Sequence, residues 1–97
     1  MKRYKISILP AARQNADETL RFLAAVSPAN ARLYRTLFTE SFRSLSEFPS
    51  RCPPARDPYM AEQGYRYLLV RNYLVFFRVF GDTVRITHIV DGRSDYL

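Results

Sequence analysis

The feature that most constrains the fold of this chain is the dipeptide Gly81-Asp82, which separates two segments rich in apolar residues. Glycine readily adopts the positive φ angles of a two-residue hairpin turn, so the dipeptide predicts a β-hairpin formed by residues 73–80 and 83–90. The length of the turn also fixes which residues face each other. Counting outward, the pairs predicted on one face are Val79 with Val84, Phe77 with Ile86, Val75 with His88, and Tyr73 with Val90. This face is almost wholly apolar, and we expect helices to cover it.

The opposite face of the predicted hairpin carries two arginines that face each other. Counting from the same turn places Arg78 beside Arg85. Two like charges across a strand pair are unfavourable unless an anion or a carboxylate lies between them, although long side chains also extend separately into water. This face is therefore the candidate binding surface, and a simply solvated pair of arginines is the alternative.

A third strand is predicted at residues 64–70, joined to the hairpin through Arg71-Asn72. A two-residue turn at this point would direct Arg66 toward the helix-covered face. One further loop residue or a bulge would direct it to the face of Arg78 and Arg85. An unpaired arginine is costly in a core, so we favour the second orientation.

The first half of the chain shows the pattern of one strand followed by two helices. Residues 2–9 alternate between apolar and polar side chains, as in a half-buried strand. Residues 11–26 have apolar residues at helical spacing, with Asp17 and Glu18 assigned to the beginning of the helix, where carboxylates suit its dipole. Ser27-Pro28 then combines a helix cap with a proline at the first helical position. A second helix of about 20 residues should follow and pack antiparallel to the first.

Prolines separate this helical half from the strands. Four of the six prolines lie within residues 49–58, which predicts an irregular connection, neither helix nor central strand. The sequence therefore predicts one α+β domain spanning residues 1–97, in the order β-α-α-β-β-β. In this domain a helical hairpin packs on one face of a twisted antiparallel sheet, and the strand at residues 2–9 is added to the C-terminal meander.

The charge of the chain favours an anionic partner. Fifteen basic residues against nine acidic ones give a net charge of +6, and thirteen of the fifteen are arginine. The planar guanidinium group binds phosphate or carboxylate through paired hydrogen bonds. Nucleic acid and an acidic protein both fit, and a solvated basic surface is the alternative.

Several other classes of protein are not expected. One cysteine, Cys52, and one histidine are too few for a zinc-like metal site or an internal disulfide, and we expect neither metal nor cofactor. No apolar run approaches the roughly 20 residues of a membrane span, and the basic start lacks the apolar segment of a signal peptide. We therefore expect a cytoplasmic protein that does not bind membranes.

Several segments of the sequence resemble a known family. These are Ser44-Leu45-Ser46-Glu47-Phe48-Pro49, the segment from Gly64 to Phe80, the Gly-Asp turn, and the segment from His88 to Tyr96. In this order they resemble the RelE/ParE superfamily of toxins from type II toxin–antitoxin systems, which includes plasmid stabilisation proteins. The resemblance covers nearly the whole chain. It implies a growth-arresting toxin that forms a hetero-oligomer with a cognate acidic antitoxin.

The superfamily holds two functions on one fold. RelE-like members cleave messenger RNA in the ribosome, whereas ParE-like members poison DNA gyrase. RelE-like enzymes are similar in placing charged residues on the strands, but Leu68 and Leu74 occupy such positions here. The resemblance is therefore nearer to ParE-like members, which implies DNA gyrase as the target. A ribosome-dependent mRNA endoribonuclease is the alternative.

The candidate site residues depend on which function holds. For a binder, the residues expected to contact the target or the antitoxin are Arg66, Arg78, Arg85 and Arg93. For a nuclease, Arg78, Arg85, Arg93 and Tyr96 form the anion-binding and proton-transfer set. Arg93 and Tyr96 follow the last strand, where they either reach a partner or merely end the fold.

Two further residues invite a chemical role but are expected to be structural. His88 has an ordinary pKa near neutrality, yet the predicted register directs it into the apolar face, where a buried structural histidine is favoured. Cys52 has no base near it in the sequence, and we expect it to be inert.

Overall fold

The elements of the computed structural model follow the expected β-α-α-β-β-β order and include two short helical segments that the sequence did not predict. The structure describes residues 2–93. Within them lie β1 (Lys5–Ile8), α1 (Pro10–Val26), α2 (Pro28–Ser44), η1 (Pro49–Arg51), α3 (Pro58–Glu62), β2 (Arg66–Val70), β3 (Tyr73–Phe80) and β4 (Thr83–Asp91). The predicted α+β class and the order of the main elements are confirmed.

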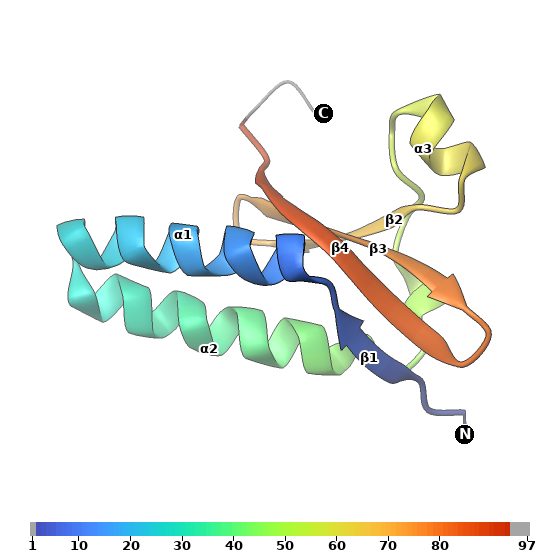
Figure 1. Cartoon of the computed structure of the whole chain (residues 1–97), viewed down its shortest axis with the longest axis horizontal. Coiled ribbons are helices and arrows are strands. Elements are labelled where there is room, and N and C mark those ends of the chain that lie inside the picture. The colour runs from blue at the N-terminus through green and yellow to red at the C-terminus, as the bar shows by residue number, and fades with distance from the viewer. Residues whose placement is uncertain (1, 94–97) are drawn as a thin grey trace.

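The two long helices form an antiparallel hairpin that packs on one face of the sheet and extends beyond it (Figure 1). The turn between them is the predicted one, because the Ser27 hydroxyl accepts a hydrogen bond from the Asn30 amide at 3.3 Å and Pro28 begins α2. Two details of the prediction are wrong. Helix α1 begins at Pro10, so Asp17 and Glu18 lie in its middle, and α2 ends at Ser44 rather than near Pro49.

The four strands form a mixed sheet in the order β1-β4-β3-β2. Strand β1 does add to the meander, but it runs parallel to β4, so the sheet is not purely antiparallel. No short turn joins β1 to the meander. The whole helical hairpin lies between β1 and β2, and a connection of that length permits a parallel pair.

A β-bulge interrupts the pairing of β3 with β4. Near the turn the predicted pairs are confirmed, including Phe77 with Ile86, but the register shifts between Phe76 and Phe77. Beyond the shift, Phe76 pairs with His88 and Tyr73 with Asp91, so the predicted pairings of His88 with Val75 and of Val90 with Tyr73 are wrong. Two hydrogen bonds hold the bulge. Thr87 Oγ1 donates to the Phe76 carbonyl at 3.2 Å, and the Ile89 amide donates to Asn15 Oδ1 of α1 at 3.0 Å.

The main hydrophobic core lies between the helical hairpin and the sheet. Its fully buried side chains are Phe77, Leu45, Ile86, Val75 and Val84. Four of these five belong to the apolar face predicted for residues 73–90, so the prediction that helices cover this face is confirmed. The bulge adds the buried Ile89 to the same core in place of His88.

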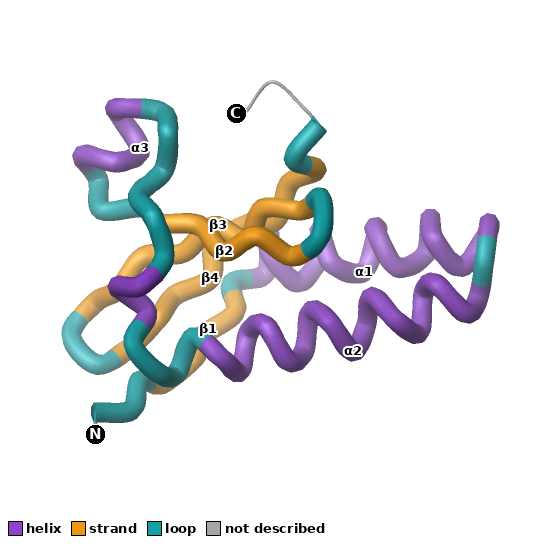
Figure 2. The backbone as a smooth tube through the Cα atoms, turned by 180° about the vertical axis from the view of Figure 1, so that it is seen from behind, coloured by secondary structure: helices purple, strands orange, loops and turns teal. Residues whose placement is uncertain are grey.

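The proline-rich segment partly covers the other face of the sheet, which we call the outer face. There Ala55 packs with Leu74 and Phe76 in a second, smaller apolar cluster. The segment also contains η1 and α3, so the prediction of a purely irregular connection is wrong. Asp57 caps α3 by accepting hydrogen bonds from the amides of the next helical residues, and Pro58 begins the helix. Figure 2 shows α3 standing at the end of the sheet away from the helical hairpin.

Candidate functional site

The two arginines predicted to face each other do so, and aromatic rings hold both of them. Arg78 pairs with Arg85 across β3 and β4 on the outer face. The Phe80 ring lies 4.8 Å from the Arg78 Cζ atom and 4.4 Å from the Arg85 Cζ atom, and the Tyr65 ring lies 5.0 Å from Arg78 Cζ. We call these four residues the arginine cluster.

The arginine cluster has no acidic partner within the part of the chain that the structure describes. The ion pairs found among residues 2–93 are Arg3 with Glu47 and Arg93 with Asp91, and neither involves Arg78 or Arg85. Contact with the aromatic faces offsets part of the repulsion between the two guanidinium groups. Both groups therefore keep their hydrogen-bonding capacity for an external carboxylate or phosphate.

Lys5 extends this basic surface, and the sequence analysis did not single it out. Parallel pairing places Lys5 beside Thr83 and Ser7 beside Arg85. The side chains of Lys5 and Ser7 therefore share the outer face with the arginine cluster. The alternation in residues 2–9 already separates Lys5 and Ser7 from the apolar side chains. That signal becomes informative only once β1 is known to lie next to β4.

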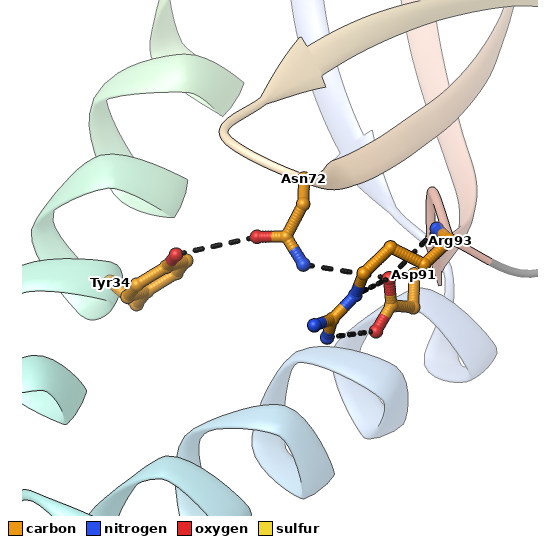
Figure 3. A network of polar contacts seen from close by, with 4 residues as sticks. All are labelled: Tyr34, Asn72, Asp91 and Arg93. Atoms are coloured by element: carbon orange, nitrogen blue, oxygen red, sulfur yellow. Dashed lines mark hydrogen bonds and ion pairs between the residues drawn. The ribbon is translucent and has the colours of Figure 1, made fainter.

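Arg93 lies beyond the opposite end of β4 and forms an ion pair with Asp91. Its guanidinium contacts Asp91 through Nη2 to Oδ2 at 2.6 Å and Nε to Oδ1 at 3.0 Å, while Asn72 joins Asp91 to the hydroxyl of Tyr34 (Figure 3). The hydrogen bonds from Arg93 hold the pKa of Asp91 well below its usual range. From Arg85 to Asp91 the strand advances about 20 Å, so Arg93 and the arginine cluster are too far apart to bind one phosphate together.

A pocket of about 210 Å³ borders Arg93 on the outer face. Its lining residues are Arg56, Tyr67, Leu69, Asn72, Leu74, Gly92 and Arg93. The lining is mainly apolar and includes the two arginines. Of the two leucines that replace expected charged residues, Leu74 lies on this face, but Leu68 packs against the main core. Leu69 is the leucine that is exposed here, with an exposed fraction of 62%.

Arg66 does not join the other arginines. A two-residue turn at Arg71-Asn72 pairs Arg66 with Phe77 and directs it to the side of the main core, so the orientation that we favoured is wrong. The expected penalty is avoided because Arg66 Nη1 donates a hydrogen bond to the Cys52 carbonyl at 2.6 Å. Tyr96, the remaining candidate, lies outside the described residues.

His88 lies on the outer face rather than in the main core, because the bulge turns its side chain over. Its ring stacks on Phe76 with centroids 4.8 Å apart and meets the edge of Tyr65 at 6.2 Å. Thr87 Oγ1 lies 3.2 Å from the Phe76 carbonyl oxygen and 2.9 Å from Nδ1 of His88, so the hydroxyl links the bulge to the imidazole ring. Burial lowers the pKa of the ring.

Two kinds of feature bear on metal and membrane binding among the described residues: a cluster of metal-ligating side chains and a helix able to span a membrane. Among residues 2–93, no group of three or more His, Cys, Asp or Glu side chains gathers at one point. No helix in that range combines the length and apolar character needed to cross a bilayer. The arrangement is therefore that of an open sheet face with arginine, aromatic and apolar side chains.

Comparison with known families identifies the chain. The family model described as "ParE toxin of type II toxin-antitoxin system, parDE" matches residues 6–96. This chain belongs to the ParE toxin family. The match confirms the resemblance to the RelE/ParE superfamily that the strand segments indicated. A comparison with curated proteins finds no match.

Two solved structures share the fold of this ParE family member. A chain of the chromosomal ParDE system from P. aeruginosa superposes with a TM-score of 0.75 at 17% identity, covering 92% of this chain and 96% of that one. A chain of the toxin–antitoxin complex RelBE2 from Mycobacterium tuberculosis gives a TM-score of 0.63 at 23% identity, covering 94% and 93%. At these identities the likeness concerns the fold alone.

Proposed function

We propose that this chain arrests growth by binding a macromolecular target such as DNA gyrase, and that a cognate acidic antitoxin neutralises it by covering the outer face. The observation that carries the proposal is the arginine cluster. Two arginines are held on aromatic rings, and no carboxylate of the described residues lies within 4.0 Å of either guanidinium group. Arginine in such a setting binds carboxylates strongly, because the guanidinium group is already oriented.

An acidic antitoxin fits both the charge and the shape of this surface. Lys5, Arg78 and Arg85 place basic side chains on three adjacent strands of the outer face, and the mainly apolar pocket beside Arg93 lies farther along the same face. A flexible acidic segment reaches both places by lying along the sheet. The similar structures come from the ParDE toxin–antitoxin system and the RelBE2 toxin–antitoxin complex, which supports a hetero-oligomer here as well.

The separation of the charged groups favours a binder over a nuclease. Arg78 of β3 and Arg85 of β4 lie near the turn that joins these strands, whereas Arg93 lies beyond the other end of β4 and is bound to Asp91. Cleavage of RNA needs cations and a proton-transfer group around a single phosphate. The pocket beside Arg93 has a mainly apolar lining that includes Leu69 and Leu74, rather than such a set of charged groups. A surface that binds a protein tolerates this spacing.

Ribosome-dependent RNA cleavage is a second candidate, and one observation favours it. His88 lies on the outer face, and Tyr65 contacts both His88 and Arg78. RNA cleavage needs a proton acceptor beside a cation that binds phosphate, and an imidazole near a guanidinium group offers both. Replacing His88 by alanine would abolish cleavage in a nuclease, whereas a binder would retain its growth arrest.

The decisive experiment compares two pairs of arginines. In the Arg78→Ala/Arg85→Ala chain we expect antitoxin affinity, measured by calorimetry, to fall at least about tenfold and to lose much of its salt dependence. Arg13→Ala/Arg32→Ala removes the same charge from exposed positions on the helices and serves as the matched control. Equal losses in the two double variants would show that only net charge matters and would refute the assignment of the outer face.

A further inference from the structure

Phe48 has a backbone conformation that is unfavourable for its residue type. Its φ and ψ angles are 49° and 58°, in the left-handed region that glycine and asparagine adopt most easily. The residue also precedes Pro49, and proline restricts its predecessor to extended conformations. If the chain needed only to reverse direction here, glycine would serve better than phenylalanine.

The side chain of Phe48 contributes little to the hydrophobic core. It has an exposed fraction of 68%, although its neighbours Leu45 and Pro49 are buried. A large apolar side chain that is both strained and exposed is stable only where the surroundings fix it. Strain of this kind concentrates at sites that bind other molecules.

Arg51 fixes the loop that presents Phe48. Its Nη1 atom donates to the carbonyls of Glu47 at 2.7 Å, Phe48 at 3.2 Å and Ser44 at 3.4 Å, and Nη2 donates to Ser44 Oγ at 3.0 Å. One guanidinium group therefore ties the end of α2 to the residue with the left-handed backbone. The exposed ring of Phe48 therefore projects from a segment whose backbone Arg51 holds in place.

The ring also forms one wall of a pocket. Phe48, Tyr4, Lys2 and Ser50 line a cavity of about 290 Å³ with a mainly apolar surface. The Lys2 ammonium group lies 4.9 Å from the centroid of the Tyr4 ring, so a cation stands at the edge of the cavity. Arg3 pairs with Glu47, whereas Lys2 and Lys5 form no ion pair among the described residues, so unshared positive charge remains at the pocket. A second copy of this chain, with its own net charge of +6, is therefore an unsuitable occupant.

We propose that this pocket anchors the acidic antitoxin, with Phe48 packing against an apolar antitoxin residue and Lys2 pairing with a carboxylate next to that residue. The inference rests on the antitoxin proposed above and adds a contact away from the arginine cluster. Charge complementarity selects the occupant, because the pocket combines aromatic walls with an unshared cation. An exposed aromatic anchor in a pocket of this kind is typical of residues that dominate binding.

The test compares two equally exposed phenylalanines. Phe22 on α1 has an exposed fraction of 67%, close to the 68% of Phe48, and lies in a regular helix outside the pocket. With the purified acidic protein encoded by the neighbouring reading frame as the probe, Phe48→Ala should weaken binding by about tenfold or more, and Phe22→Ala should leave it unchanged. Retained affinity in Phe48→Ala would overturn the proposal, as would an equal loss in Phe22→Ala.

A third variant separates binding from stability. Glycine suits the left-handed backbone, so Phe48→Gly should unfold at a urea concentration at least as high as Phe48→Ala while binding as weakly. If Phe48→Gly and Phe48→Ala both unfold at a lower urea concentration than the wild-type chain, in step with their loss of binding, the ring supports the fold, and the proposal is wrong. If the wild-type chain binds and only the Arg78→Ala/Arg85→Ala chain loses affinity, the proposed function stands and this inference fails. If Phe48→Ala keeps its antitoxin but loses growth arrest, the pocket binds the target, and the proposal that the antitoxin occupies it is wrong.

Discussion

Replacing Phe80 by leucine tests whether its ring holds the arginine cluster together. The Arg78 and Arg85 Cζ atoms lie 4.8 and 4.4 Å from the ring centroid, and at exposed sites each such contact is worth about 0.5–1 kcal/mol. Leucine keeps an apolar side chain but loses both contacts and leaves two like charges opposite each other. We therefore expect the free energy of unfolding to fall by about 1–2 kcal/mol.

Urea denaturation followed by circular dichroism measures this loss. For a small domain the free energy changes by roughly 1–3 kcal/mol per molar urea, so the midpoint should fall by on the order of 1 M. In the Arg78→Ala/Arg85→Ala chain the same substitution should cost less than about 0.5 kcal/mol, because its partners are already absent. An equal loss in both chains would show that Phe80 acts through its own packing, and our reasoning about the cluster would be refuted.

Three further predictions concern single residues. Gly92→Ala should lower the free energy of unfolding by about 1–3 kcal/mol in urea titrations, because an added Cβ would lie 2.7 Å from the Asn72 carbonyl oxygen; an unchanged midpoint would contradict this close approach. Burial lowers the pKa of His88 below its ordinary 6.5, so its contribution to stability is complete above that pH and is lost as the pH falls through the lowered pKa. His88→Gln should therefore flatten the fall in thermal midpoint below neutrality, and a variant with the wild-type slope would exclude His88 as its cause. Cys52 is buried, and this burial raises the pKa of its thiol although the charges of Arg51 and Arg66 act in the opposite direction. A thiol reagent at mildly alkaline pH should therefore label Cys52 only as the chain unfolds, and rapid labelling of the folded chain would disprove this.

The sequence predicted the sheet most accurately where the determining contacts are local. Gly81 has a φ of 60°, and the Gly81-Asp82 turn sets the pairing of Arg78 with Arg85 as counting outward indicated. The bulge a few residues farther on depends on Asn15, which lies 74 positions before Ile89 and accepts its amide hydrogen bond. No local pattern contains that contact, so the face occupied by His88 was predicted wrongly.

The orientation of Arg66 failed for a related reason. The argument that an arginine avoids the core side assumed that no acceptor was present there. The proline-rich segment supplies one, because it bridges to β2 at Pro54 and brings the Cys52 carbonyl to the guanidinium group. Helix α3 was missed for a different reason, because its signal is local. Asp57-Pro58 is a capping residue followed by a proline at the first helical position, and the count of prolines in this segment outweighed it.

The most direct test of the proposed function is a supercoiling assay with purified DNA gyrase and this chain. If this chain poisons gyrase, supercoiling should fall as the toxin concentration rises, and the antitoxin should restore it. The Arg78→Ala/Arg85→Ala chain should inhibit supercoiling less than the wild-type chain. Normal supercoiling at toxin concentrations that arrest growth, together with codon-dependent cuts in ribosome-bound messenger RNA that the same double variant no longer makes, would contradict the proposal and establish the nuclease in its place.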